Sequence, residues 1–155
     1  MEVLESLFTK ALKLESPWFK KKIEFHEGKG VINVFVDFPL GSVFCCPVCG
    51  KSVKAYDTTE REWRHLNFFQ YACYLVVRVP RTDCSDDGIL QIEVPWARDG
   101  ADFTFLLESF AMTLVREMPV NKVSQIIKVD DNKLWRMMRY YTETARQRED
   151  YSSVK

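Results

Sequence analysis

The stretch FCCPVCGKSV (residues 44–53) contains three of the chain's five cysteines. Cys46 and Cys49 are separated by Pro-Val, and Gly50 follows them. This Cys-Pro-Val-Cys-Gly stretch is a knuckle, which supplies half of a four-ligand metal site. Five cysteines is an odd number, and clustered cysteines are more typical of metal ligands than of a disulfide framework. The stretch therefore predicts a metal site whose other half lies elsewhere in the chain.

The second half is expected in RTDCSDDGIL (residues 81–90). Cys84 is followed three positions later by Asp87 and then by Gly88, so the Cys-x-x-Cys-Gly shape recurs with a carboxylate in place of the second sulfur. A glycine after each knuckle suits a turn that needs positive φ, and zinc accepts carboxylate oxygen as well as sulfur. We predict a structural Zn²⁺ held by Cys46, Cys49, Cys84 and Asp87.

Other donors and other outcomes stay open. The ribbon could have lost its metal, with its cysteines packing as small apolar residues. Asp86 and Cys45 neighbour the predicted ligands, and His65 and Cys73 lie between the two knuckles. We expect Cys45 to point away, Cys73 to be core and His65 to be a hydrogen-bonded structural residue. A catalytic zinc is disfavoured because no HExxH or His-x-Glu motif accompanies the cysteines.

The front of the chain is rich in β-strand patterns. A helix is expected over residues 2–14, and residues 19–38 predict a hairpin around the turn EGKG, with Ile32, Val34 and Val36 on one face. Residues 56–80 predict strands with a turn near Thr58, Thr59 and Glu60, and QIEVPW predicts a further short strand. ARDGAD, from Ala97, is expected to be a linker.

The back of the chain has helical periodicity. A first helix is expected from Phe103 to Leu114, and Pro119 is expected to begin a second. After the turn KVDDN, Asp130 or Asp131 would cap a longer helix. Its predicted buried stripe is Leu134, Trp135, Met138 and Tyr141.

Two helices joined by a tight turn, the second bearing Lys and Arg, are typical of a helix-turn-helix. Residues near the start of a recognition helix contact base edges, so we expect base contacts from Asn132, Lys133 and Arg136. Arg139 and Lys128 suit phosphate contacts. The alternative is an ordinary solvated basic face, since two aspartates lie beside it. Arg61, Arg64, Arg78 and Arg81 could extend a phosphate-binding surface, unless neighbouring glutamates simply neutralise the first two.

The sequence thus predicts an α+β chain: β-hairpins with a zinc ribbon, followed by an all-α helix-turn-helix subdomain. The expected domains are residues 1–97 and 102–155. The formal net charge is zero, which counts against a strongly basic nucleic-acid binder. No apolar run approaches the roughly 20 residues that span a bilayer, and the N-terminus lacks the features of a signal peptide, so a cytoplasmic protein is expected.

The order CPVCG, EWRHLNFFQYACYLVVRVPR, C-x-x-D-G, EVPWAR and FTFLLESF, over residues 18–145, resembles the N-terminal region of the ISL-three family of insertion-sequence transposases. The resemblance also implies a helix-turn-helix in the back half. In that family the second knuckle ends in Cys or His, so Asp87 is a departure that bears on metal affinity rather than on the fold. Family members continue into a catalytic domain with three metal-binding carboxylates, which is expected to be absent from a chain that stops at Lys155.

The expected function is recognition of the double-stranded DNA of mobile-element terminal repeats, without catalysis. A homodimer and a separate catalytic chain are open as partners. The rival interpretation is a protein-interaction module or a transposase remnant that binds no DNA. An enzyme with Cys45 or Cys73 as a nucleophile beside His65 comes third, since no motif supports it.

Overall fold

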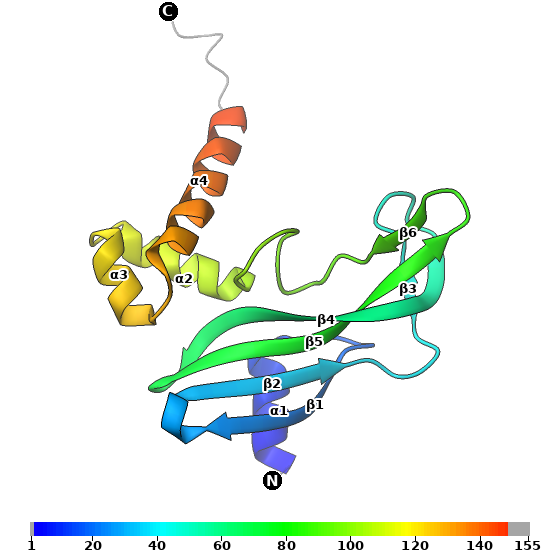
Figure 1. The fold of residues 1–155 in the computed structure, drawn as a ribbon, viewed down its shortest axis with the longest axis horizontal. Helices are drawn as coiled ribbons and strands as arrows, with labels where there is room; N and C mark the ends of the chain where they lie inside the picture. The colour runs from blue at the N-terminus through cyan, green and yellow to red at the C-terminus, as the bar shows by residue number, and fades with distance from the viewer. Residues whose placement is uncertain (1, 149–155) are drawn as a thin grey trace, which may run out of the picture. The chain divides into compact units, whose positions relative to one another are not determined.

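The computed structural model describes residues 2–148, which divide into two compact units between Phe105 and Leu106. The first unit holds helix α1 (Glu2–Ala11) and a sheet, and the described part of the second holds helices (Figure 1). The α+β class expected from the sequence is confirmed. Residues 149–155 of the expected second domain lie outside the described part of the chain.

Within residues 2–148, six strands form one sheet of order β1-β2-β5-β4-β3, with β6 paired to β5. The strands and a 3-10 turn, η1, have these bounds: β1 Phe19–His26, η1 Glu27–Lys29, β2 Val31–Asp37, β3 Val43–Cys45, β4 Ser52–Phe68, β5 Tyr71–Cys84 and β6 Gly88–Gln91. Neighbours are antiparallel except β2 and β5, which run parallel. The hairpin expected over residues 19–38 is confirmed.

The core of the first unit lies on one face of this sheet. Ile32, Val34 and Val36 of β2 are buried as their alternation predicted, and β5 lays Cys73, Leu75, Val77 and Val79 beside them. Four aromatic residues make edge or tilted contacts beneath the strands, with ring centroids 4.9–5.6 Å apart: Trp18, Phe38, Phe44 and Trp96. Phe44 lies in the knuckle hairpin, so this packing fixes the base of the hairpin that carries Cys46.

Two local predictions in the β-rich half are wrong. Thr58, Thr59 and Glu60 do not turn but pair with Pro80, Val79 and Arg78 in the middle of β4, because β-branched threonines favour an extended strand when a partner is available. The turn between β4 and β5 falls at Phe69 and Gln70 instead. The second error is QIEVPW: β6 ends at its first residue, Gln91.

The segment expected to be a linker packs against the first unit. Ala97 and Ala101 are buried. The Arg64 amide donates to Asp102 O at 2.9 Å, and the Thr104 amide donates to Arg64 O at 3.0 Å. These two hydrogen bonds show that residues 102–104 lie beside β4. Their backbone groups complete the hydrogen bonding of that strand.

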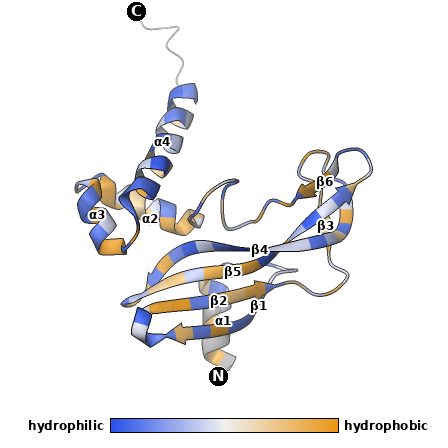
Figure 2. Cartoon of the chain, viewed as in Figure 1, coloured by the Kyte–Doolittle hydropathy of each residue, from blue (hydrophilic) through white to orange (hydrophobic). Residues whose placement is uncertain are grey.

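The second unit contains α2 (Phe105–Val115, which begins one residue before the unit), α3 (Val120–Ile127) and α4 (Asp131–Arg148). All three helices contribute residues that are at most 2% exposed: Leu107, Ala111, Val123, Ile127, Leu134 and Met137. The buried Glu108 accepts a hydrogen bond from the Tyr141 hydroxyl at 3.0 Å, which links α2 to α4. Figure 2 shows that α4 is largely hydrophilic along its length.

The buried stripe predicted for α4 is partly wrong. Leu134 is buried, but Trp135 is 53% exposed and Met137 takes its place in the core. Positions 134, 137 and 141 recur at helical spacing, whereas residue 135 is rotated about 100° away from residue 134. Ile126 of α3 is likewise 53% exposed, whereas Val123 and Ile127 of the same helix are buried.

Candidate metal centre and nucleic-acid interface

Two hairpin ends bring the predicted metal ligands together. Cys46 and Cys49 lie in the loop between β3 and β4, whereas Cys84 is the last residue of β5 and Asp87 lies in the turn that leads to β6. Their ligand atoms all lie within 4.8 Å of one another. Gly50 and Gly88, which follow the knuckles, have φ of +76° and +78°, so both turns use the left-handed conformation that glycine adopts without strain.

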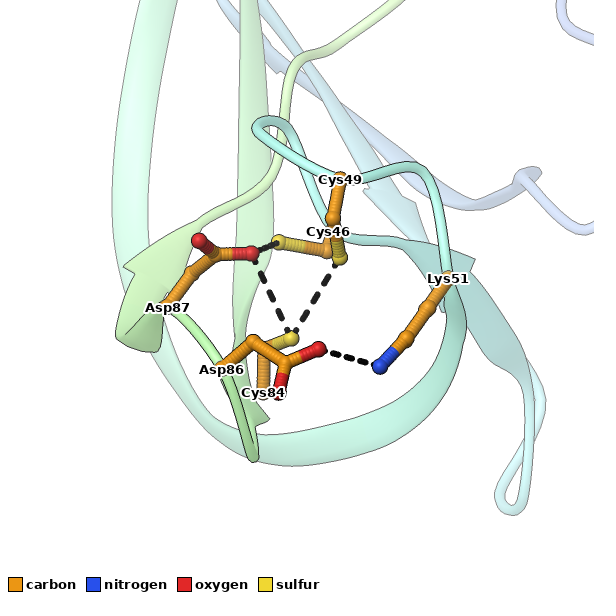
Figure 3. Close-up of polar contacts among 6 residues, drawn as sticks. All are labelled: Cys46, Cys49, Lys51, Cys84, Asp86 and Asp87. Atoms are coloured by element: carbon orange, nitrogen blue, oxygen red, sulfur yellow. Dashed lines mark hydrogen bonds and ion pairs between the residues drawn. The ribbon is translucent and has the colours of Figure 1, made fainter.

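The distances within this ligand cluster are close to those of a tetrahedral site. The Cys46 thiol donates to Asp87 Oδ2 at 3.3 Å, and the Cys84 thiol donates to the same oxygen at 3.5 Å. Cys49 Sγ and Cys84 Sγ are 3.5 Å apart (Figure 3). Two thiolates, each about 2.3 Å from a zinc ion at tetrahedral angles, would be roughly 3.8 Å apart. With no pair of ligand atoms more than 4.8 Å apart, shifts of up to about 1 Å would fit the four donors around one ion.

The four donors of the ligand cluster shift one another's pKa values. The Lys51 backbone amide lowers the pKa of Cys49, but Asp87, burial and the other thiols outweigh it and raise that pKa to about 12. Hydrogen bonds from Cys49 and Cys46 lower the pKa of Asp87, and the backbone amides of Asp86 and Asp87 lower that of Cys84. The cluster thus keeps protons on some thiols while other groups ionise. A dication is the species that would hold all four as anions.

Lys51 and Asp86 form an ion pair across the two knuckles (Figure 3). Asp86 is the principal group that raises the pKa of Lys51, followed by the charges of Cys49, Cys84 and Asp87. A zinc ion with three thiolates and one carboxylate would carry about two net negative charges, and Lys51 supplies a neighbouring positive one. The sequence interpretation missed Lys51, although its position directly after the first knuckle is visible in the sequence.

The alternative donors lie outside the ligand cluster. Asp86 is engaged by Lys51, and Cys45 is exposed on β3. Cys73 is 3% exposed within the hydrophobic core, and burial raises its pKa to about 11. His65 Nδ1 lies 2.7 Å from Thr104 Oγ1. The expectations for Cys73 as a core residue and for His65 as a hydrogen-bonded residue are therefore confirmed, and Cys45 is not among the clustered donors.

Arg64 has a structural role in the first unit, unlike the phosphate contact considered for it. Its side chain is buried, and its guanidinium donates to the backbone oxygens of His65 and Cys73 and to Asn67 Oδ1. Burial lowers the pKa of Arg64, and burial together with the nearby Arg64 charge lowers the pKa of His65 to about 4. These contacts tie β4 to β5.

The remaining arginines of the β-half make their own contacts. Arg78 Nε donates to Asp37 Oδ1 at 3.0 Å, and Arg81 pairs with Asp57 through two hydrogen bonds. Arg61 lies 5.0 Å from the centre of the Trp63 ring. Arg78 and Arg81 are thus each paired with an aspartate on a neighbouring strand. The aspartates offset the positive charge that the two arginines could present to phosphate.

The turn between α3 and α4 is built from short-range contacts. Lys128 adopts φ +56°, and its amide donates to Ser124 O, which ends α3. The Ser124 hydroxyl donates to Val129 O at 2.6 Å. Asp130 Oδ1 accepts from the Asn132 amide at 2.7 Å, so Asp130 caps α4 as the sequence predicted. Three residues, 128–130, separate the two helices, which is the connection length of a helix-turn-helix.

The residues predicted to contact DNA are all exposed: Asn132, Lys133, Arg136 and Arg139 on α4, and Lys128 in the turn. Positions 132, 136 and 139 recur at the spacing of one helical face, opposite Leu134 and Met137, and Lys133 lies at the flank of that face. The helix carries five basic and two acidic residues. It presents a positively charged, polar face beside a buried apolar one.

Two family models match successive parts of the chain. Residues 42–87 match the zinc-finger of transposase IS204/IS1001/IS1096/IS1165, and residues 92–142 match the helix-turn-helix domain of transposase family ISL3. The first match ends at Asp87, so it spans both knuckles. The second includes residues 92–105, which precede the helical unit.

Curated relatives match as well. The chain is 26% identical over 129 residues to the transposase for insertion sequence element IS1557 from two Mycobacterium tuberculosis strains, CDC 1551 / Oshkosh and ATCC 25618 / H37Rv. Each alignment covers 79% of this chain and 29% of the relative, so the chain spans less than a third of the curated relatives' length. No solved structure matches the chain.

These matches show that the chain contains regions similar to two domains of insertion-sequence transposases. The two domains are the zinc-finger and helix-turn-helix regions of family ISL3, and the resemblance found in the chain's sequence motifs is confirmed. Among residues 2–148, none of the helices has the length and apolarity needed to cross a bilayer.

Proposed function

We propose that these residues form a sequence-specific binding module for double-stranded DNA, which recognises the terminal repeats of a mobile element. The observation that carries the proposal is the exposed face of α4, where Asn132, Arg136 and Arg139 recur opposite the buried Leu134 and Met137. A helix of this kind, entered through a tight three-residue turn, suits the major groove. The name of the curated relatives, a transposase for an insertion sequence element, supports this choice of DNA.

The proposed roles on α4 follow from distance to the start of the helix. Asn132, Lys133 and Arg136 lie in its first two turns and would contact base edges, where Asn suits adenine and Arg suits guanine. Arg139 lies a turn further on and would contact phosphate with Lys128 of the turn. The helices act in this proposal as an all-α helix-turn-helix domain within residues 102–155, and residues 102–104 at its start pair with β4.

The zinc ion has a structural role in the proposal. One Zn²⁺ would be held by Cys46, Cys49, Cys84 and Asp87. It would crosslink the ends of two hairpins, whose ligands Cys49 and Cys84 are separated by 35 positions in the sequence. Such a crosslink would stabilise loops that bury little apolar surface of their own. Residues 1–97 would form this ribbon domain.

The proposal assigns no catalytic step to residues 2–148. Strand transfer would be carried out by residues beyond those described or by a separate chain, and a homodimer would let two modules engage paired repeats. The module would work in the cytoplasm, where insertion-sequence DNA is accessible in bacteria.

The experiment that tests the function is selection of a duplex from a randomised library by the 155-residue chain loaded with zinc. Binding of the selected duplex is then compared for the wild type, Arg136→Ala and Arg116→Ala. Arg116 is exposed between α2 and α3, so it matches the charge change without touching α4. Arg136→Ala should lose roughly 1–3 kcal/mol of discrimination against mutated sites, while Arg116→Ala keeps it. A library that shows no enrichment, or equal behaviour of the two variants, would refute the assignment.

A further inference from the structure

Trp135 differs from the other tryptophans of the chain in its exposure. Trp18, Trp63 and Trp96 are 7%, 2% and 8% exposed, and all belong to the core of the first unit. Trp135 lies in the second turn of α4 and is 53% exposed. The largest apolar side chain of that helix is therefore left outside the core, although residue 134 beside it is fully buried.

The helix geometry places Trp135 beside the proposed DNA-contacting face. At about 100° per residue, Trp135 is rotated roughly 60° from Asn132 and 40° from Arg139 around the axis of α4. It lies about 100° from Leu134, the nearest member of the buried stripe in angle. Lys133 and Trp135 thus flank the face formed by Asn132, Arg136 and Arg139 on opposite sides.

The charges around Trp135 favour DNA over a second copy of the chain. Arg139 lies one turn after Trp135 and Asp131 one turn before it, and α4 as a whole carries five basic and two acidic residues. A two-fold contact between two copies would bring the basic residues of each α4 towards their symmetry mates, which like charges oppose. Phosphates flanking a groove would instead complement the basic residues and leave the indole facing base edges.

We propose that Trp135 contacts the 5-methyl group of a thymine in the major groove and so selects a T·A pair within the site. The inference rests on the proposed function, because it needs α4 to enter the groove. The 5-methyl group is the apolar feature that the major groove offers, and an indole edge can cover it. Asn132 and Arg136 would specify polar positions of the site, and Trp135 would specify an adjacent thymine.

The test uses the selected duplex described above, with each thymine replaced in turn by deoxyuridine, which removes only the methyl group. At the contacted position the wild type should lose about 4-fold in affinity, as expected for one buried methyl. Trp135→Ala should bind the unmodified duplex roughly 10-fold more weakly and should lose nothing further on the same replacement. Phe110→Ala, which removes a 44% exposed aromatic residue from α2, is the matched control and should retain the wild-type sensitivity.

Acrylamide quenching gives a second readout that does not depend on the affinity of a variant. In the free chain the quenchable emission should come from Trp135 and disappear in Trp135→Phe. Addition of the selected duplex should protect it in the wild type.

The outcomes separate this inference from the function on which it rests. If Arg136→Ala loses specificity while Trp135→Ala binds normally and Trp135 stays quenchable in the complex, the function holds and the thymine contact is wrong. If Trp135→Ala instead abolishes self-association, measured by sedimentation without DNA, the residue serves a protein contact and the inference falls. A library without enrichment overturns both proposals.

Discussion

The buried histidine of β4 leads to a prediction about pH. His65 is 8% exposed, and its Nδ1 lies 2.7 Å from the Thr104 hydroxyl. Burial, followed by the charge of Arg64, lowers its pKa from 6.5 to about 4. The folded protein therefore holds a neutral imidazole at pH values where the unfolded chain binds a proton. The resulting stability is complete above pH 6.5 and is lost as the pH falls towards 4.

The magnitude follows from the two pKa values. With a pKa of 6.5 in the unfolded chain and about 4 in the folded one, lowering the pH from 7 to 5 should reduce the free energy of unfolding of the first unit by about 2 kcal/mol. Below pH 4 the loss should level off at about 3 kcal/mol.

The assay is urea unfolding followed by tryptophan emission, since three of the four tryptophans are buried in the first unit. His65→Asn keeps a polar group towards Thr104 but does not titrate. The difference between this variant and the wild type removes contributions from other groups. The wild-type protein should lose about 2 kcal/mol more than His65→Asn between pH 7 and 5. His26→Asn, at the exposed end of β1, should behave as the wild type, and equal pH slopes in the wild type and His65→Asn would refute the reasoning.

Three further predictions concern the metal and the helices. Cys46→Ser should lose zinc, as measured by elemental analysis, whereas the control Cys45→Ser should keep about one zinc per chain. The loss of zinc should lower the free energy of unfolding by about 3 kcal/mol relative to the wild type at free zinc 100-fold above Kd. Equal metal content in the two variants would exclude Cys46 as a ligand. Asp87→Cys should bind zinc more tightly in chelator competition, since thiolate is the softer ligand, and weaker binding would argue against Asp87 as a ligand. Met137→Ala should cost about 2–5 kcal/mol in thermal unfolding and Met138→Ala clearly less, because Met137 is 1% exposed and Met138 is partly exposed; similar costs would contradict the observed stripe.

The knuckles could be predicted because their information is local. Cys-x-x-Cys-Gly and Cys-x-x-Asp-Gly each place two ligands and a turn glycine within five residues. These two short motifs were enough to predict that the two hairpin ends come together. The choice of Asp87 over Asp86 was also made from spacing. In the structure Asp86 lies outside the ligand cluster and pairs with Lys51, a contact that depends on how the two hairpins approach each other.

Other features depend on tertiary packing that periodicity does not encode. Leu134 and Trp135 are adjacent large apolar residues, so α4 can bury either one until the packing against other helices selects Leu134 and Met137. Arg64 alternates with buried residues on β4 and would ordinarily face solvent. It is buried because residues 102–104 lie beside the strand, a contact between segments almost 40 residues apart.

Recognition of a particular DNA sequence by the chain can be measured by fluorescence anisotropy with the zinc-loaded protein. The probes are a duplex carrying the terminal repeats of the mobile element nearest its gene and a scrambled duplex of the same composition, at two salt concentrations. A module that reads DNA should bind the repeat more tightly, with affinity that falls steeply as salt rises. Equal and weak binding to both duplexes would contradict this recognition and would leave a ribbon scaffold that binds other proteins.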